Sequence, residues 1–268
     1  MKIRGGNLDD CESELKAITE WGYDKDLNVG NEVLQYLQNI FWILREKAKT
    51  TEVREFLHDG DKVCILPGMI NHKCSNDIEV LKTISQFGIL ASEWFGILES
   101  EREGRFCSFV DRIKPEEYKD SWDNYRRLKS QGDDVVLFFD SDNEVMQYLL
   151  HLDYFEYERI KKQNPEKLHE IYLPEEIMLF ESLIAPLSPA GKNYHDDSKK
   201  DKPFFHWSAI PGGIPSELVN GICLKNNQYS DGYVQELSSL FPNAIIFNGN
   251  LEIVYKPDKN MESSKNTL

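Results

Sequence analysis

The chain has 268 residues, 40% of them hydrophobic and 29% charged, so it is long enough to bury a substantial core. Its 31 basic and 46 acidic residues give a net charge of −15, which argues against non-specific binding to nucleic acid or anionic membranes. The five cysteines form no CxxC pair, which argues against a disulfide framework or a zinc site. Neither a signal peptide nor an apolar run of ~20 residues is evident. We therefore predict a cytoplasmic protein with no membrane association and no bound metal.

Apolar periodicity and turn residues predict alternating helices and short strands along the chain. The expected elements, in chain order, are one long helix or two short ones over 31–57, strand 62–66, helix 78–87, strand 105–113, helix 115–131, strand 134–140, helical stretches near 142–163 and 174–184, apolar stretches 204–210 and 217–224, helix 230–240, and strands 243–248 and 251–255.

Turn signals set the boundaries between these elements. Pro67-Gly68 is expected to end the first strand, and His72 then falls in a polar turn. Ser75-Asn76-Asp77 predicts a helix cap, and Gly88 predicts the end of the same helix. Asn248-Gly249 predicts a hairpin between the last two strands.

The mixture of helices and strands lacks regular βαβ alternation, which predicts an α+β fold with a mixed, mainly antiparallel sheet. Neither G-x-G-x-x-G nor a P-loop motif occurs. We expect an N-terminal helical region over residues 1–60, one α+β domain over 61–256, and a flexible tail over 257–268.

Residues 67–92, PGMINHKCSNDIEVLKTISQFGILAS, place a histidine before a capped helix that ends at a glycine. This order resembles the opening motif of ADP-ribosyltransferases, where a strand with a histidine precedes a helix and a "GLLAS"-like stretch. The resemblance implies that His72 holds a ribose hydroxyl of NAD, with Cys74 or Ser75 beside it. Lys73 and Cys74 stand where the family often has glycine and threonine. The alternative is an ordinary histidine in a turn.

Residues 105–113, RFCSFVDRI, form a strand pattern of aromatic and small polar residues. In the same family a second strand of this kind lines the nicotinamide pocket. The resemblance therefore implies that Phe106, Cys107 and Ser108 contact the nicotinamide. Simple alternation in a core strand is the alternative.

Residues 204–224 contain Gly212-Gly213 between two prolines, which predicts a sharp reversal between two apolar stretches. The segment resembles the third family region, where a strand with a catalytic glutamate precedes a glycine–proline turn. Cleavage of the nicotinamide–ribose bond builds up oxocarbenium-like charge that a carboxylate stabilises. By simple register the family glutamate would fall near His206-Trp207, where no acid stands. Either Glu217, just past the turn, takes the role as the candidate catalytic acid, or the register is different, or the site is catalytically altered. The alternative is an acid in a first helical turn after Ser216.

The resemblance, over about residues 62–256, implies an NAD-dependent mono-ADP-ribosyltransferase, such as a bacterial toxin or a phage-defence effector. NAD would be its substrate and a protein or small molecule its acceptor. A non-catalytic acidic binding protein on the same fold, antitoxin- or immunity-like and with a basic protein partner, is the alternative. A cysteine hydrolase using Cys107 or Cys74 is a third hypothesis. The acidic cluster at 140–144 is interpreted as a strand end and helix cap rather than a calcium loop.

Overall fold

The computed structural model describes residues 31–66, 68–90, 107–113, 135–183, 205–225 and 229–257. Several predictions fall outside these residues: the helix over 115–131, the pocket residue Phe106, and the tail from residue 258 onward.

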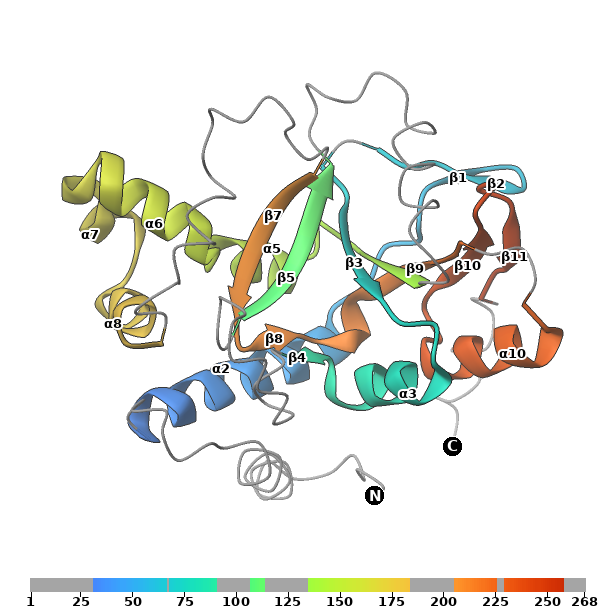
Figure 1. Ribbon diagram of the computed structural model, residues 1–268, viewed down its shortest axis with the longest axis horizontal. Coiled ribbons are helices and arrows are strands. Elements are labelled where there is room, and N and C mark those ends of the chain that lie inside the picture. Colours follow the sequence, from blue (N-terminus) through green and yellow to red (C-terminus); the bar gives the residue numbers. More distant parts are fainter. Residues whose placement is uncertain are drawn as a thin grey trace.

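A seven-stranded sheet forms the centre of the fold, with strand order β11–β10–β9–β6–β3–β5–β7 (Figure 1). Neighbouring strands are antiparallel, except that β9 and β10 are parallel and are joined through helix α10. The general α+β prediction is confirmed. The strands are β3 (Ile70–Cys74), β5 (Cys107–Ile113), β6 (Val135–Phe139), β7 (Phe205–Pro211), β9 (Val219–Leu224), β10 (Ile245–Asn248) and β11 (Ile253–Tyr255).

Two short strand pairs lie beside this sheet. The strands β1 (His58–Asp59) and β2 (Lys62–Val63) form one pair, and β4 (Ile89–Leu90) with β8 (Gly213–Ile214) forms the other. The second pair joins the end of the predicted 78–87 helix to the double-glycine turn, so two of the motif segments are hydrogen-bonded to each other.

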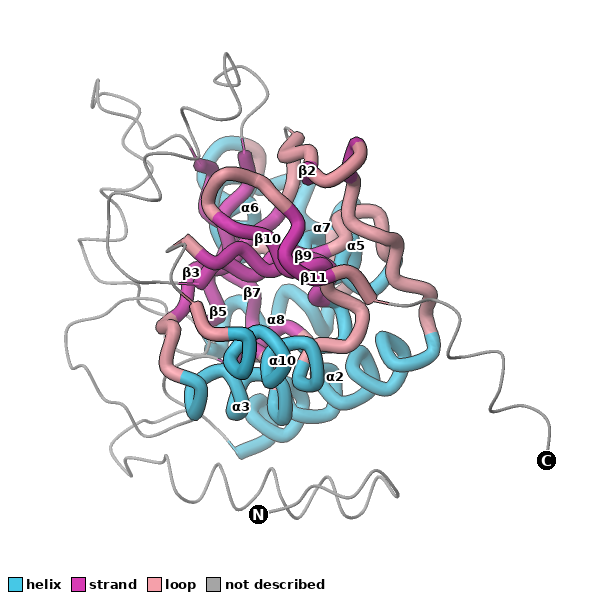
Figure 2. Tube along the Cα trace, turned by 90° about the vertical axis from the view of Figure 1, so that its right-hand side faces the viewer, coloured by secondary structure: helices cyan, strands magenta, loops and turns pink. Residues whose placement is uncertain are grey.

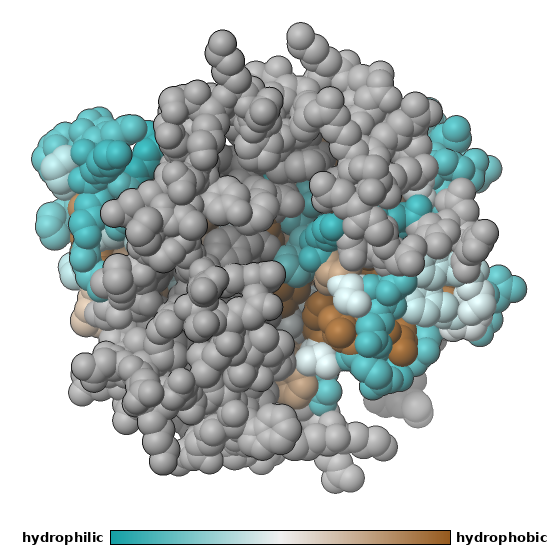
Figure 3. All heavy atoms as spheres, in the orientation of Figure 1, coloured by the Kyte–Doolittle hydropathy of each residue, from teal (hydrophilic) through white to brown (hydrophobic). Residues whose placement is uncertain are grey.

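The helices lie in two groups around the sheet. One group, α2 (Asn31–Thr50), α3 (Ile78–Phe87) and α10 (Asp231–Leu240), lies below it in both ribbon views (Figures 1 and 2). The second group follows β6 and lies on the β7 side, where Figure 3 shows hydrophilic residues over the outer parts of α6 and α7. The second group comprises α5 (Glu144–His151), α6 (Tyr154–Gln163), the 3₁₀ turn η3 (Pro165–Lys167), α7 (Leu168–Ile171) and α8 (Pro174–Leu183). None of the helices in the described ranges is long and apolar enough to cross a bilayer.

Both faces of β6 are buried, which explains why the sequence of this strand is apolar throughout. Val135, Leu137 and Phe139 join the main core, which includes Leu44 of α2. The alternate residues of β6 join a smaller cluster on the other face, in which Phe138 packs with Phe56 and Phe247. A strand that is buried on both faces therefore has a continuous apolar sequence, without alternating polar residues.

The predicted strand over residues 62–66 is confirmed only for its first two residues. Only Lys62–Val63 is strand there, and Ile70–Cys74, where a polar turn is expected from the sequence, is an interior strand of the main sheet. The segment INHKC contains few apolar residues, but its backbone pairs with β6 on one side and β5 on the other. Backbone pairing on both edges outweighs the weak apolar pattern. His72 consequently lies inside β3, an interior strand of the sheet.

The predictions made from local capping residues agree with the structure better than the prediction of a strand over residues 62–66 does. Asp77 caps α3, because its carboxylate accepts a hydrogen bond from the amide of Glu79 at 3.0 Å. The Gly88 amide donates to the Ile84 carbonyl at 2.7 Å, as a helix-ending glycine should. The β10–β11 hairpin is also confirmed. The predicted helix 142–163 is instead broken at Leu152, after which Asp153 caps α6.

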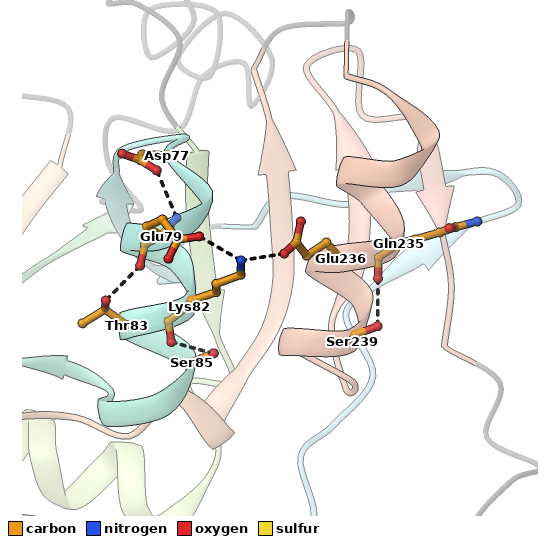
Figure 4. A network of polar contacts seen from close by, with 8 residues as sticks. All are labelled: Asp77, Glu79, Lys82, Thr83, Ser85, Gln235, Glu236 and Ser239. Carbon is orange, nitrogen blue, oxygen red and sulfur yellow. Dashed lines mark hydrogen bonds and ion pairs between the residues drawn. The ribbon is translucent and has the colours of Figure 1, made fainter. Parts of the chain in front are cut away.

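A surface ion network links α3 to α10 (Figure 4). The Lys82 ammonium lies 2.8 Å from Glu79 and 2.9 Å from Glu236, and these contacts raise the pKa of Lys82. All three groups are exposed to solvent, so water and salt screen their attraction. The docking of these helices therefore depends on their apolar faces, such as Leu81 and Leu237 in the main core.

Candidate functional site

The three segments that carry the family resemblance lie on neighbouring strands. β3 contains His72, β5 contains Ser108, and β7 leads into the double-glycine turn. In the register, Ile70 of β3 lies opposite Arg112 of β5, which lies opposite His206 of β7. Segments more than 130 residues apart in sequence thus meet at one end of the sheet.

The pleat divides the predicted NAD-binding residues between the two faces of the sheet. His72 lies opposite Leu137, and Cys74 packs against the main core, so both positions are on the main-core face. Ser108 lies opposite the buried Ile210 and shares this face, whereas its neighbour Cys107 is on the other one. Ser75 follows the strand and accepts a hydrogen bond from the Asp77 amide at 3.1 Å. His72, Cys74 and Ser108 are the predicted residues that share a face.

Apolar residues occupy the space between His72 and the double-glycine turn. His72 is half-buried, and the core next to it includes Val110, Ile210 and Ile214. The turn itself is buried, with φ of 83° at Gly212 and 158° at Gly213. On this face, any dinucleotide would have to bind at the half-exposed margin of the core rather than within it.

Glu217, the candidate catalytic acid, is held in an ion pair. It lies in the 3₁₀ turn η4 (Ser216–Leu218), and its carboxylate is 2.9 Å from Nε of Arg45 on α2. The Arg45 side chain is 8% exposed and that of Glu217 20% exposed. The Arg45 guanidinium also lies 5.3 Å from the centre of the Trp42 ring. The carboxylate therefore links α2 to η4, as the structural alternative for this first-turn acid implies.

Arg45→Met should lower the free energy of unfolding by about 2 kcal/mol, because a largely buried carboxylate then loses its counter-charge. Chemical denaturation monitored by fluorescence measures this change. The matched control is Arg159→Gln, which breaks the exposed pair with Glu156 and should have little effect. Equal effects of the two substitutions would contradict a structural role for the Arg45–Glu217 pair.

A buried polar cluster, defined by Arg112, Asp153 and Ser208, lies where α6 meets β7. The Asp153 Oδ1 accepts hydrogen bonds from the amides of Phe155 at 3.1 Å and Ala209 at 2.9 Å. One carboxylate thereby caps α6 and also satisfies an amide of the strand at the sheet edge. Asp153 was missed from the sequence, because it falls inside the predicted helix 142–163; the available signal was an aspartate directly before an aromatic helix start.

Burial dominates the electrostatics of this cluster. It raises the pKa of Asp153, although the two amides, the Ser208 hydroxyl and the Arg112 charge all favour the ionised carboxylate. Burial also lowers the pKa of Arg112, opposed by the charges of Asp153 and Glu156. The Ser208 hydroxyl lies near Asp153 but makes no hydrogen bond of normal geometry among the described residues.

A second buried carboxylate, Glu176, joins α5 to α8. It accepts hydrogen bonds from the Tyr148 hydroxyl at 3.0 Å and the Leu173 amide at 2.9 Å, and it lies 3.2 Å from Nε2 of His151. The His151 ring is also 5.0 Å from that of Tyr172. These contacts fix the imidazole in a helix-packing role.

The acidic cluster after β6 has structural roles, in agreement with its interpretation as a strand end and helix cap. Asp140 accepts hydrogen bonds from the amides of Arg54 at 3.0 Å and Asp142 at 3.1 Å. Asn143 caps α5 through the Val145 amide at 2.9 Å. Within the described part of the chain, no group of three or more histidine, cysteine or acidic residues could hold a metal ion.

Comparisons with known protein families, curated proteins and solved structures give no match for this chain. The functional argument therefore depends on the residues and geometry described above.

Proposed function

We propose that the protein is an NAD-dependent ADP-ribosyltransferase-like enzyme that modifies a protein or a small molecule, as a toxin or phage-defence effector would. The observation that supports this proposal best is the adjacency of β3, β5 and β7. These strands carry the three segments that resemble the family, and a site built from all three requires them to be neighbours. NAD is the substrate in this proposal, and no metal takes part.

His72 is the central residue of the proposed site. It is half-buried in β3, on the same face as Cys74 and Ser108. A half-exposed imidazole at a fixed position can donate to or accept from a ribose hydroxyl that lies at the margin of the core. In this proposal His72 anchors the ribose and Ser108 lies toward the nicotinamide.

The proposed activity also requires a catalytic carboxylate, and the structure offers no free one at the expected position among the described residues of β7. The β7 positions that correspond to the family glutamate are His206 and Trp207, which face Arg112 and Asp111 across the β5–β7 pair. Glu217 could act on the oxocarbenium-like charge only if its carboxylate left Arg45. The proposal therefore makes activity depend on release of this ion pair.

The direct test is NAD consumption by the purified protein, with release of nicotinamide followed by chromatography. His72→Ala should reduce the rate about tenfold or more, the equivalent of one lost hydrogen bond. His169→Ala, at an exposed position on α7, is the matched control and should retain the wild-type rate. Glu217→Gln should also reduce turnover. Unchanged turnover in the His72 and Glu217 variants would refute the assignment of these roles.

The Arg45–Glu217 ion pair specifically favours a second candidate, a non-catalytic acidic protein that binds a basic partner. A carboxylate neutralised inside the structure is unavailable for catalysis, and the net charge of −15 favours a cationic partner. The test is binding to a purified basic protein, such as a candidate toxin or nuclease from the same genome, at increasing salt. Tight, salt-sensitive binding without NAD consumption favours this candidate.

A further inference from the structure

The connection from α7 to α8 exposes three large apolar side chains to solvent. Ile171 is 40% exposed, Leu173 62% and Met178 50%, and we call these three residues the apolar patch. Single exposed apolar residues are ordinary, whereas several in one short segment, rimmed by polar groups, mark an interaction surface. Figure 1 shows α7 and α8 outside β7, at one side of the molecule, where a partner can reach them.

The apolar patch is not used in the packing of these helices. The inward residues of the same segment are Tyr172, Leu179 and Phe180, and each of them is at most 3% exposed. The Tyr172 and Phe180 rings lie 5.3 Å apart, and both lie against the Tyr157 ring of α6. One side of the α7–α8 segment is therefore already buried, and the apolar patch lies on its solvent side.

Exposed carboxylates surround the apolar patch. Glu170 and Glu175 are its neighbours in sequence, and Glu166 lies one helical turn before Glu170. All three are exposed, and none of them forms an ion pair with another residue of the described ranges. We call these residues the acidic rim. Lys167 is the exposed base of the same stretch, so the net charge of the rim stays negative.

We propose that the apolar patch and the acidic rim dock a basic amphipathic helix of a partner protein. Its apolar stripe would cover the patch, and its lysine or arginine side chains would lie against the rim. Charge complementarity selects this occupant. A second copy of the chain would bring two acidic rims together, and an anionic membrane would be repelled. The proposal rests on the second candidate function, the binding of a basic partner, and gives that function its surface.

The experiment is a titration of a fluorescent peptide with the full chain, followed by anisotropy. The probe is an amphipathic peptide of leucine and lysine, ~18 residues or five helical turns long. Leu173→Ser and Met178→Ser should each weaken binding about fivefold to tenfold, as loss of an apolar anchor does. Val254→Ser is the matched control, because Val254 is 48% exposed on β11, at the other edge of the sheet. It should bind as the wild type.

The acidic rim is tested by removing charge. The double variant Glu170→Gln, Glu175→Gln should weaken binding and make it less sensitive to salt. The matched control, Asp59→Asn with Asp61→Asn, removes the same charge from exposed positions of the β1–β2 hairpin and should have a smaller effect. Equal losses in the two double variants would overturn the role of the rim, because only the net charge of the chain would then matter.

The proposal is overturned if the peptide does not bind, or if Leu173→Ser, Met178→Ser and Val254→Ser affect binding equally. Binding that all three variants retain would place the basic partner on another surface and leave the second candidate function intact. Self-association of the wild type that Leu173→Ser abolishes, measured by sedimentation, would identify a second copy as the occupant and also overturn the proposal. Since no NAD is present, none of these results bears on the transferase proposal.

Discussion

Gly88→Ala is expected to lower the free energy of unfolding by about 4 kcal/mol, as the sum of backbone strain and overpacking. Gly88 has φ of 83° and ψ of −179°, a conformation that side chains rarely adopt. A Cβ at this position would lie 2.6 Å from the carbonyl oxygen of Ile214 and 3.1 Å from the ring of Phe41. The oxygen belongs to the backbone of β8, which pairs with β4, so it cannot move without breaking that pair.

Thermal unfolding monitored by circular dichroism measures this effect, and a loss of about 4 kcal/mol corresponds to a decrease in Tm of roughly 10 °C for a chain of this size. Gly68→Ala is the matched control. Gly68 has φ of 84°, but a Cβ there would meet no atom within 4 Å. It should cost only the strain, about 1–2 kcal/mol. Equal losses in the two variants would show that the contact with Ile214 is unimportant.

Asp153→Ala is the second substitution with a large expected effect, a loss of about 3 kcal/mol. The alanine leaves the buried amides of Phe155 and Ala209 without their acceptor, and each unsatisfied donor costs about 1–3 kcal/mol. Urea denaturation, with a constant m-value as a check on two-state unfolding, measures the loss. Asp153→Asn is the control that retains an acceptor oxygen and should be much less destabilised. Similar losses for alanine and asparagine would contradict this account of the two amides.

The same carboxylate predicts a direction of pH dependence. Burial raises the pKa of Asp153 in the folded protein above its ordinary value of 3.8. A raised carboxyl pKa means that the folded state binds the proton more tightly than the unfolded chain does. The resulting stabilisation is complete below the ordinary pKa and is lost as the pH rises through the folded pKa. Asparagine does not titrate, so Asp153→Asn should become more stable relative to wild type as the pH rises above about 4, the ordinary pKa of an aspartate.

The candidate site could be predicted from the sequence only in part. The three segments could be found by their residue order, but their adjacency as β3, β5 and β7 depends on long-range pairing that the local pattern does not encode. The split between Ser108 and Cys107 follows from the register of β5, in which a shift by one residue would exchange the faces. The Arg45 partner of Glu217 lies 172 residues away and left no local signal.

The sequence by itself determined the elements whose causes are local: the Asp77 cap, the Gly88 helix end, the buried run of β6 and the hairpin at Asn248. Capping, glycine conformations and apolar periodicity act over a few residues, so neighbouring residues suffice to predict them. Only the tertiary structure decided that INHKC is an interior strand of the sheet and that Asp153 accepts hydrogen bonds from a helix and from a strand at once. These features depend on backbone groups finding partners far along the chain, because buried polar groups must be satisfied wherever the fold places them.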